Sequence, residues 1–271
     1  MEFVRAYDIS QDDRFFDIYA VSDGGYIMCG KANYAGRFRR NDMIVVRVDS
    51  EGELIWSETY GDGFLDYSAK SIVETDNGEF FSGGEAYNGD NRSQQFMATL
   101  LNNDGEVEWQ RDYGESSCYA VIELKSGEFM LAGITGDTAQ LIKIDNDGDV
   151  IWQETYQHNE NRLFNSMRET EGGVVASGNR AVWVIKVDED DGGIIWSEDH
   201  NANIVGSCEM TSTVDGGFAV ALYNSGGNGN NYGLFKVNDE GQAIWERNYE
   251  NEDGNRQYAE SLTRLKRQTL H

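Results

Sequence analysis

The sequence predicts an all-β fold built from five similar units of four short strands each. A stretch that ends in tryptophan recurs five times, at intervals of 43 to 53 residues: Trp56, Trp109, Trp152, Trp196 and Trp245. A second shared element precedes each of them: "SDGGYIMCG" (22–30), "DNGEFFSGG" (76–84), "KSGEFMLAG" (125–133), "EGGVVASG" (171–178) and "VDGGFAVAL" (214–222). Repeats of 40 to 50 residues with four strands and one tryptophan are typical of β-propeller blades.

The four strands of a unit can be placed in order. Strand a reads like "AKSIVET" (69–75), and after the D-G-G type of turn strand b reads like "EFFSGG" (79–84). A variable loop leads to strand c, as in "AQLIKID" (139–145), and a D-x-x-G turn leads to strand d, as in "VIWQETY" (150–156). β-Branched and aromatic residues fill the strands. Because the chain has 31 glycines and no proline, its turns must be made with Gly, Asn, Asp and Ser.

Residues 1–271 are predicted to form a single propeller domain. The predicted blades are 14–60, 65–114, 116–156, 162–201 and 203–250. Residues 2–8 resemble strand d and residues 258–265 resemble strand a, so each terminal strand lacks blade partners. Unpaired strand edges recruit other strands. We therefore expect a ring of six positions whose last blade is incomplete, with a five-blade ring as the alternative, or a homodimer in which edge strands pair.

The stretch "KIDNDGDVIW" (143–152) allows two interpretations. Asp145, Asp147 and Asp149 around a glycine resemble the start of a calcium loop, but the same letters suit a tight turn. A calcium loop needs an acidic ligand about twelve positions in, where Tyr156 stands. The other copies replace the key oxygens with Ser50, Asn103 and Glu240. The sequence therefore favours a hairpin turn between strands c and d.

The units resemble the tandem "D-G-G-Y-I-x-x-G" and "D-x-x-G-x-x-x-W" propeller repeats of archaeal and bacterial proteins, which are similar in style to quinoprotein and Kelch propellers. The resemblance covers residues 3–265 and implies the fold. It implies no particular activity or cofactor, because such propellers serve as enzymes, lectins and scaffolds alike.

The charge of the chain restricts its partners. Forty-eight acidic and 22 basic residues give a net charge of −26, which repels nucleic acid and anionic membrane surfaces. Only seven of the basic residues are lysine. This composition resembles that of proteins from salt-loving organisms, where salt screens the repulsion; cation binding and mimicry of nucleic acid are the alternatives.

No segment predicts membrane insertion. The N-terminal "MEFVRAYDIS" lacks the apolar core of a signal peptide, and no apolar run approaches the roughly 18 residues that span a bilayer. We expect a soluble chain of unknown compartment, extracellular or on the cell surface if it is an excised domain. Cys29, Cys118 and Cys208 are widely spaced, so buried thiols are expected rather than disulfides or a zinc site.

Residues with catalytic potential are few. His200 occupies the position of Tyr60 and its counterparts four residues after the tryptophan, so it is expected to pack. One position of strand c carries a cation in four units, which indicates an architectural role: Arg47, Lys143, Lys186 and Lys236. No nucleophile elbow, metalloprotease motif or phosphate loop occurs. We predict no catalytic residue, metal or cofactor.

Function is expected at the end of the blades that carries the b–c and d–a loops, because these loops vary between units. The candidate ligand-binding residues are Tyr34, Arg37, Arg39, Arg40, Tyr87, Asn91, Arg92, His158 and Arg162. Aromatic residues beside arginine and asparagine suit a protein or glycan ligand. The sequence therefore favours a non-enzymatic binding or scaffold module. A metal-assisted hydrolase or lyase and a structural part of a larger surface protein are the alternatives.

Overall fold

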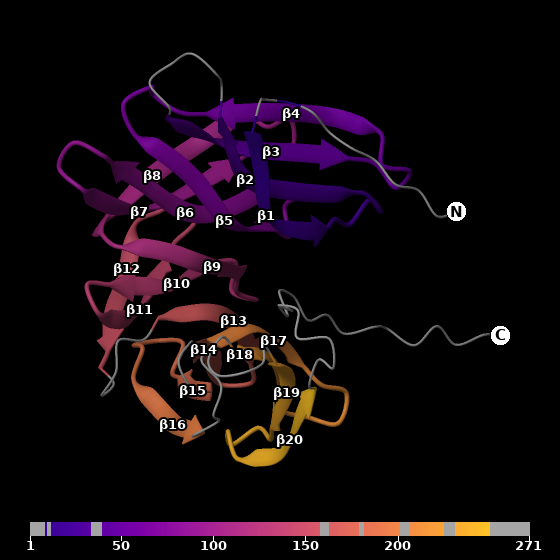
Figure 1. Ribbon diagram of the computed structural model, residues 1–271, viewed down its shortest axis with the longest axis vertical. Coiled ribbons are helices and arrows are strands. Elements are labelled where there is room, and N and C mark those ends of the chain that lie inside the picture. The colour runs from indigo at the N-terminus through magenta and orange to yellow at the C-terminus, as the bar shows by residue number, and fades with distance from the viewer. Residues whose placement is uncertain are drawn as a thin grey trace. The chain divides into compact units, whose positions relative to one another are not determined.

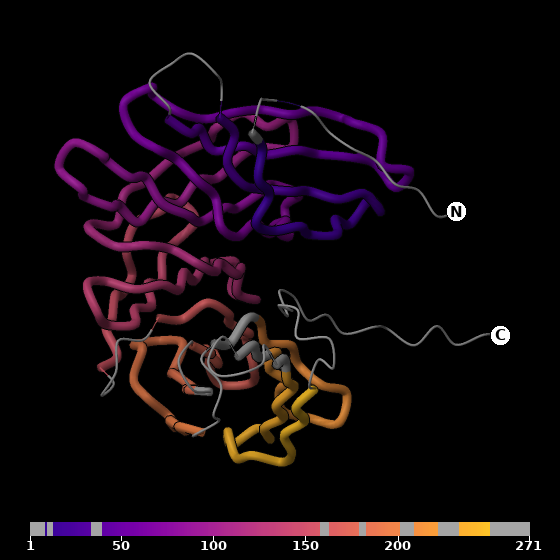
Figure 2. Tube along the Cα trace, in the orientation of Figure 1, coloured from indigo at the N-terminus to yellow at the C-terminus, as the bar shows by residue number. Residues whose placement is uncertain are grey.

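The computed structural model describes residues 9, 12–33, 40–157, 163–178, 182–200, 206–224 and 231–249 (Figures 1 and 2). These residues form twenty strands in five four-stranded sheets, and no helix occurs among them. The predicted all-β fold of five blades is confirmed. Because the described residues contain no helix, they contain none that could cross a membrane.

The strands of each sheet follow one another in chain order. Blade 1 contains β1 (Asp12–Ala20), β2 (Tyr26–Asn33), β3 (Asn41–Val48) and β4 (Leu54–Tyr60). Blade 2 contains β5 (Asp66–Glu74), β6 (Phe80–Asn88), β7 (Ser93–Leu101) and β8 (Val107–Glu115). Blade 3 contains β9 (Ser117–Glu123), β10 (Phe129–Thr135), β11 (Thr138–Ile144) and β12 (Val150–Tyr156). Blade 4 contains β13 (Phe164–Thr170), β14 (Gly173–Gly178), β15 (Val182–Val187) and β16 (Ile194–His200). Blade 5 contains β17 (Gly206–Ser212), β18 (Phe218–Asn224), β19 (Asn231–Val237) and β20 (Ala243–Tyr249).

The chain divides into two compact units. Unit 1 comprises residues 1–136 and 140–155, and unit 2 comprises residues 137–139 and 156–271. Blades 1 to 3 belong essentially to unit 1, and blades 4 and 5 to unit 2. The predicted terminal strands, 2–8 and 258–265, lie outside the described residues, so the closure of the ring stays a prediction.

The D-x-x-G segments are turns between strands c and d. In blade 3, Oδ1 of Asp145 accepts hydrogen bonds from the backbone N–H groups of Asp147 at 3.0 Å and Asp149 at 2.8 Å. Gly148 has a φ of +82°, in the left-handed region that glycine adopts without strain. Asp49, Asn102 and Asn238 make the same pair of hydrogen bonds in their own turns. The hairpin-turn interpretation is therefore confirmed, since the aspartate oxygen holds the backbone of the turn.

The repeated spacing of tryptophan and tyrosine joins neighbouring blades within each unit. In unit 1 the Trp56 indole N–H donates to the Asn103 carbonyl at 3.0 Å, and the Tyr60 hydroxyl donates to the Gly105 carbonyl at 2.6 Å. Trp109 and Tyr113 repeat these contacts with the c–d turn of blade 3. In unit 2, Nε2 of His200 lies 2.8 Å from the Gly241 carbonyl oxygen, and its ring packs on Phe235. His200 thus takes the packing role predicted for it.

The cations of strand c bond to the a–b turns, which gives them the architectural role that the sequence predicted. Arg47 is buried and bonds to Asp23, and it lowers the pKa of that carboxyl below its usual value. Nζ of Lys143 lies 2.7 Å from Glu128, and Lys236 pairs with Asp215. Lys186 donates to the backbone carbonyl of the corresponding turn in blade 4. These side chains each tie strand c to the turn that leads into strand b.

The cores are apolar and contain two of the cysteines. In unit 1, Phe81 stacks on Phe129 with 4.1 Å between ring centroids. Cys29 and Cys118 are buried and unbridged, and burial raises the pKa of both thiols, as expected of structural cysteines. The side chain of Cys208 lies outside the described residues.

Candidate functional site

The predicted binding residues that the structure describes at the end of the blades that carries the b–c and d–a loops lie on blades 1 and 2 of unit 1. Five of the predicted binding residues, Tyr34, Arg37, Arg39, His158 and Arg162, lie outside the described residues. The structure places the other four, Arg40, Tyr87, Asn91 and Arg92, in or beside the b–c loops of these two blades.

An ion pair joins Arg40 of blade 1 to the b–c loop of blade 2. Nη2 of Arg40, the residue before β3, lies 3.7 Å from Oδ2 of Asp90 in that loop. Tyr87 closes β6 next to this loop, and its side chain is 36% exposed. The structure therefore brings Arg40 to the same loop that carries Tyr87 and Arg92. Exposed pairs of this kind contribute little to stability, so the pair shows proximity rather than a strong link.

Asn91 and Arg92 have different roles in the turn. Oδ1 of Asn91 accepts hydrogen bonds from the N–H and hydroxyl of Ser93 at 3.0 and 2.8 Å, so this oxygen is used by the loop itself. Arg92 has a φ of +62°, a conformation that costs a non-glycine residue roughly 1–2 kcal/mol. The Arg92 side chain is exposed. Strained residues cluster at ligand sites, and the strain here falls on Arg92.

Strand a contains a β-bulge at the same position in blades 1 to 4. One extra residue interrupts the pairing of strands a and b in each of the first four blades: Phe16, Lys70, Tyr119 and Asn165. The last glycine of the "D-G-G-Y-I-x-x-G" element faces this bulge. A Cβ on Gly84 would lie 2.0 Å from the Ser68 carbonyl oxygen, and Gly30 and Gly133 face the equivalent oxygens equally closely. The glycine therefore permits the bulge, and bulges redirect side chains at functional sites.

The bulged side chains of blades 1 and 2 meet in a cluster that sequence reasoning missed. Nζ of Lys70 lies 4.2 Å from the centre of the Phe16 ring and 3.2 Å from Oε1 of Glu85. Gln94 donates to the other oxygen of Glu85. Burial, and less strongly the Glu85 carboxylate, raises the pKa of Tyr119 in blade 3. The bulge position varies in residue type from blade to blade, but the bulge itself has no signal in the sequence.

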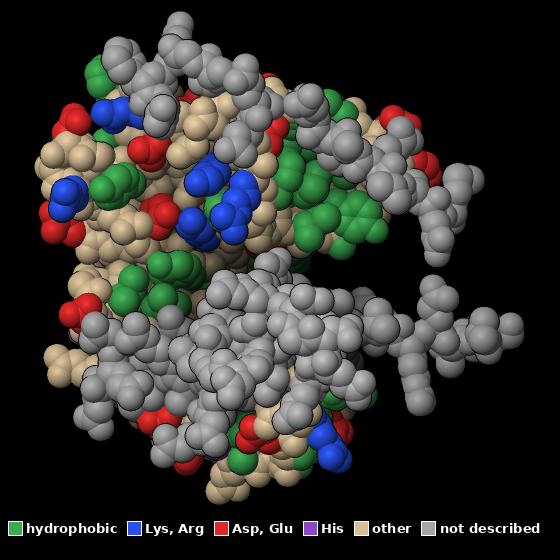
Figure 3. All heavy atoms as spheres, in the orientation of Figure 1, with side chains coloured by type: hydrophobic (Ala, Val, Ile, Leu, Met, Phe, Trp, Pro, Cys, Tyr) green, Lys and Arg blue, Asp and Glu red, His purple; other side chains and the backbone are tan. Residues whose placement is uncertain are grey.

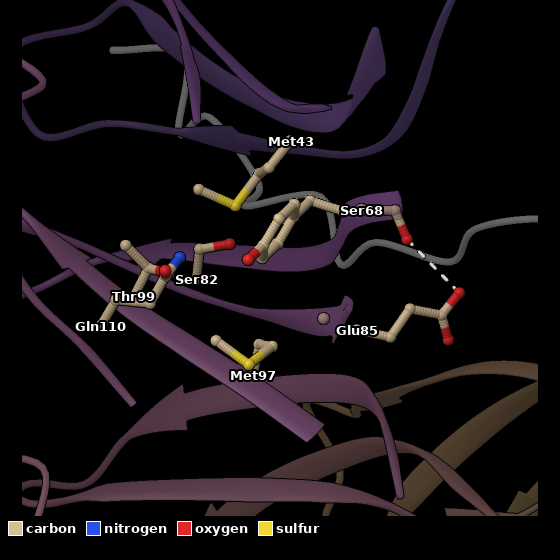
Figure 4. A pocket seen from close by; sticks show the side chains of 9 residues that line it. Met43, Ser68, Ser82, Glu85, Met97, Thr99 and Gln110 are labelled. Atoms are coloured by element: carbon tan, nitrogen blue, oxygen red, sulfur yellow. Dashed lines mark hydrogen bonds between the residues drawn. The ribbon is translucent and has the colours of Figure 1, made fainter. Parts of the chain in front are cut away.

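The hollow beneath Glu85 is too small for a substrate. It measures about 10 Å³ and lies between Met43 and Met97, with Ser82, Thr99 and Gln110 as its polar lining (Figure 4). A hollow of this size holds at most one water molecule. The dashed line in Figure 4 marks the hydrogen bond from the Ser68 hydroxyl to Glu85, at 3.4 Å.

A larger groove of about 540 Å³ lies at the opposite end, between the turns of blades 2 and 3. Trp109 and Phe129 line it, and most of its charged groups are acidic: Asp76, Glu79, Glu108, Glu123 and Asp147, with Lys125 as the cation. Burial, with Asp76 and Glu79 adding repulsion, raises the pKa of Glu123 even though Glu123 accepts the Asp76 N–H. No group of three or more His, Cys, Asp or Glu residues in the described part of the chain is arranged to hold a metal ion.

Comparison with known proteins identifies the family. Residues 41–251 match the family described as outer membrane protein assembly factor BamB. The chain belongs to this family. The match covers β3 and β4 of blade 1 and all of blades 2 to 5, so it includes most of the surfaces described above. No curated protein matches the chain.

Solved structures similar to this BamB-like chain include propellers. The β-propeller domain of Cps50 (Swd1) from Myceliophteria thermophila has a TM-score of 0.54 at 14% identity, with 89% of this chain and 75% of that chain covered. The NanB sialidase from Streptococcus pneumoniae, as a variant, has a TM-score of 0.62 at 12% identity over 89% of this chain and 61% of the sialidase. A functionally unknown protein from Desulfotomaculum acetoxidans has a TM-score of 0.55 at 11% identity, with coverages of 88% and 70%. At these identities the likeness shows the fold alone.

Proposed function

We propose that this BamB-like propeller is a non-enzymatic binding module whose ligand docks on the b–c loops of blades 1 and 2. The observation that carries the proposal is the Arg40–Asp90 ion pair, which brings Arg40 of blade 1 to the b–c loop of blade 2, where Tyr87 and Arg92 are exposed. Tyrosine and arginine are enriched among the residues that dominate binding energies. A loop held in one conformation also loses less entropy when a ligand binds.

A protein is the first expected ligand, and a glycan is the second. The family description names an assembly factor for outer membrane proteins, which is a role in protein binding. The nearby hollow of about 10 Å³ admits no substrate, which supports binding at a surface rather than catalysis in a pocket.

Selection of peptides from a displayed library against the whole chain tests this proposal. Selected peptides should bind Tyr87→Ala and Arg92→Gly at least about tenfold more weakly, since arginine and aromatic anchors contribute 2 kcal/mol or more. Glycine suits the positive φ of residue 92, so Arg92→Gly should fold at least as well as the parent chain.

Arg111→Gln is the matched control, because Arg111 is an exposed arginine that contacts the c–d turn of blade 3 at the other end. Equal affinity of all three variants would refute the proposed surface. Selective binding of a glycan array instead of peptides would keep the surface and change the ligand class.

A hydrolase is the second candidate function, and one observation favours it. The groove between the turns of blades 2 and 3 holds Glu123, whose pKa is raised by burial, and carboxyls with raised pKa values serve as general acids. Hydrolysis of a chromogenic glycoside or ester panel that is lost in Glu123→Gln would support it. An inactive parent chain, or activity unchanged in the variant, would exclude Glu123 as its general acid.

A further inference from the structure

Two cations face each other in blade 1. Arg14 of β1 and Lys31 of β2 are direct partners in the register of the two strands. Like charges placed opposite each other destabilise an antiparallel pair. Neither side chain forms an ion pair with any residue that the structure describes, although the chain has 48 acidic residues against 22 basic ones. In so acidic a chain, two opposed cations without a carboxylate need an explanation.

A third cation approaches them from blade 2. Cζ of Arg14 lies 5.0 Å from the centre of the Phe16 ring, and Nζ of Lys70 lies 4.2 Å from the same ring. Cations are attracted to the face of an aromatic ring, so the bulged Phe16 gathers Arg14 and Lys70 around itself. Figure 3 shows the resulting group of basic side chains over β1, β2 and β5 of unit 1.

The group carries an excess of positive charge. Glu85 pairs with Lys70 at 3.2 Å, and it is the single carboxylate with a salt bridge to these three cations in the described part of the chain. Gln94 and Ser68 also donate to Glu85, which holds its carboxylate on the Lys70 side of the group. Three cations and one carboxylate leave a formal charge of +2.

We propose that Arg14, Lys31 and Lys70 form a binding site for a dianionic group, a phosphate or a pair of neighbouring carboxylates. The guanidinium fork of Arg14 matches two oxygens of such a group, and the two ammonium groups add charge without directional demands. The half-buried Phe16 ring holds Arg14 and Lys70 near each other, so the two cations can face one ligand. The site lies on the strands of blades 1 and 2 and does not depend on the loop surface proposed above.

The test is thermal melting of the whole chain with two probes, inorganic phosphate and malonate, at constant ionic strength. A ligand that binds the folded state raises the melting temperature with its concentration. We expect at least one probe to do so. Phosphate alone would identify a tetrahedral anion, and malonate alone would identify a dicarboxylate.

Variants locate the binding. Lys31→Gln removes the repulsion with Arg14, so without a probe it should melt no lower than the parent chain. It should bind the effective probe about tenfold more weakly in a calorimetric titration, as loss of one charge-assisted contact predicts. Arg111→Gln, which removes a positive charge from blade 2 outside the group, is the control and should leave the affinity unchanged. The proposal is overturned if neither probe stabilises the parent chain, or if Lys31→Gln and the parent chain bind the probe equally.

Discussion

Two glycines of blade 2 allow the contact between blades to be measured separately from backbone strain. Gly78, in the a–b turn, has a φ of +80°, and no atom lies within 4 Å of a Cβ added there. Gly105, in the c–d turn, has a φ of +85°, but an added Cβ would lie 3.2 Å from the Trp56 ring of blade 1. Substitution by alanine therefore imposes the same backbone conformation at both sites and a steric contact at one of them.

The expected magnitudes differ accordingly. Gly78→Ala should cost about 1–2 kcal/mol of unfolding free energy, the penalty for a left-handed L-residue. Gly105→Ala should cost about 1–3 kcal/mol more, because it overpacks the contact with Trp56. At roughly 2–4 °C per kcal/mol for a domain of this size, the melting temperatures of the two variants should differ by several degrees.

A double-mutant cycle with Trp56→Phe assigns the difference to the tryptophan. The smaller ring relieves the contact, so Trp56→Phe should cost less stability in the Gly105→Ala background than in the parent chain. The assay is denaturant unfolding followed by far-ultraviolet circular dichroism, since Trp56 itself is altered. Equal destabilisation by the two glycine variants, or a cycle without coupling, would refute the packing of Trp56 on the c–d turn of blade 2.

Four further outcomes are expected. The buried hydroxyl of Ser177 has no hydrogen-bond partner among the residues that the structure describes, so Ser177→Ala should raise the unfolding free energy by about 1 kcal/mol in a urea titration; a loss of stability would contradict its isolation. The pKa of Glu123 is raised in the folded state. The contribution of Glu123 to the free energy of unfolding is therefore favourable at low pH and is lost as the pH rises through that pKa. Glu123→Gln should therefore melt higher than the parent chain at pH 7 but not near pH 3, below the usual pKa of about 4.3. Dilution from molar to millimolar potassium chloride should lower the melting temperature because screening weakens; insensitivity to salt would count against a salt-adapted composition. Removal of residues 256–271 should lower the melting temperature or dissociate a dimer in light scattering, whereas an unchanged monomer would favour the five-blade ring.

The repeat made most of the fold predictable. Trp56 and its four counterparts recur with the same neighbours, and all five lie on the fourth strand of a blade. The closure of the ring was not predictable in the same way, because the terminal segments 2–8 and 258–265 are single strands without a complete unit around them. Blade 1 shows the consequence. Ile18 occupies the position of Ile72 and Val121 in the next two blades, which are buried, yet Ile18 is 61% exposed. Within unit 1, no blade covers this face of blade 1.

The candidate site was predictable only in its loops. Variation between units pointed to Tyr87 and Arg92, because loops on a rigid scaffold vary where they bind. The cluster around Phe16 was not predictable, because the contact with Lys70 joins two blades across 54 residues of sequence. It also depends on a bulge, and one extra residue changes which side chains share a face. The amino-acid sequence of strand a alone does not reveal where its pairing with strand b shifts.

Hydrogen–deuterium exchange of the chain, with and without a selected peptide, tests the central claim most directly. The account predicts slower exchange on binding in the b–c loop of blade 2, residues 88–93, and no change in the turns at the other end of blades 2 and 3, residues 75–79 and 145–149. Slower exchange confined to those turns would place the ligand in the acidic groove and contradict the account.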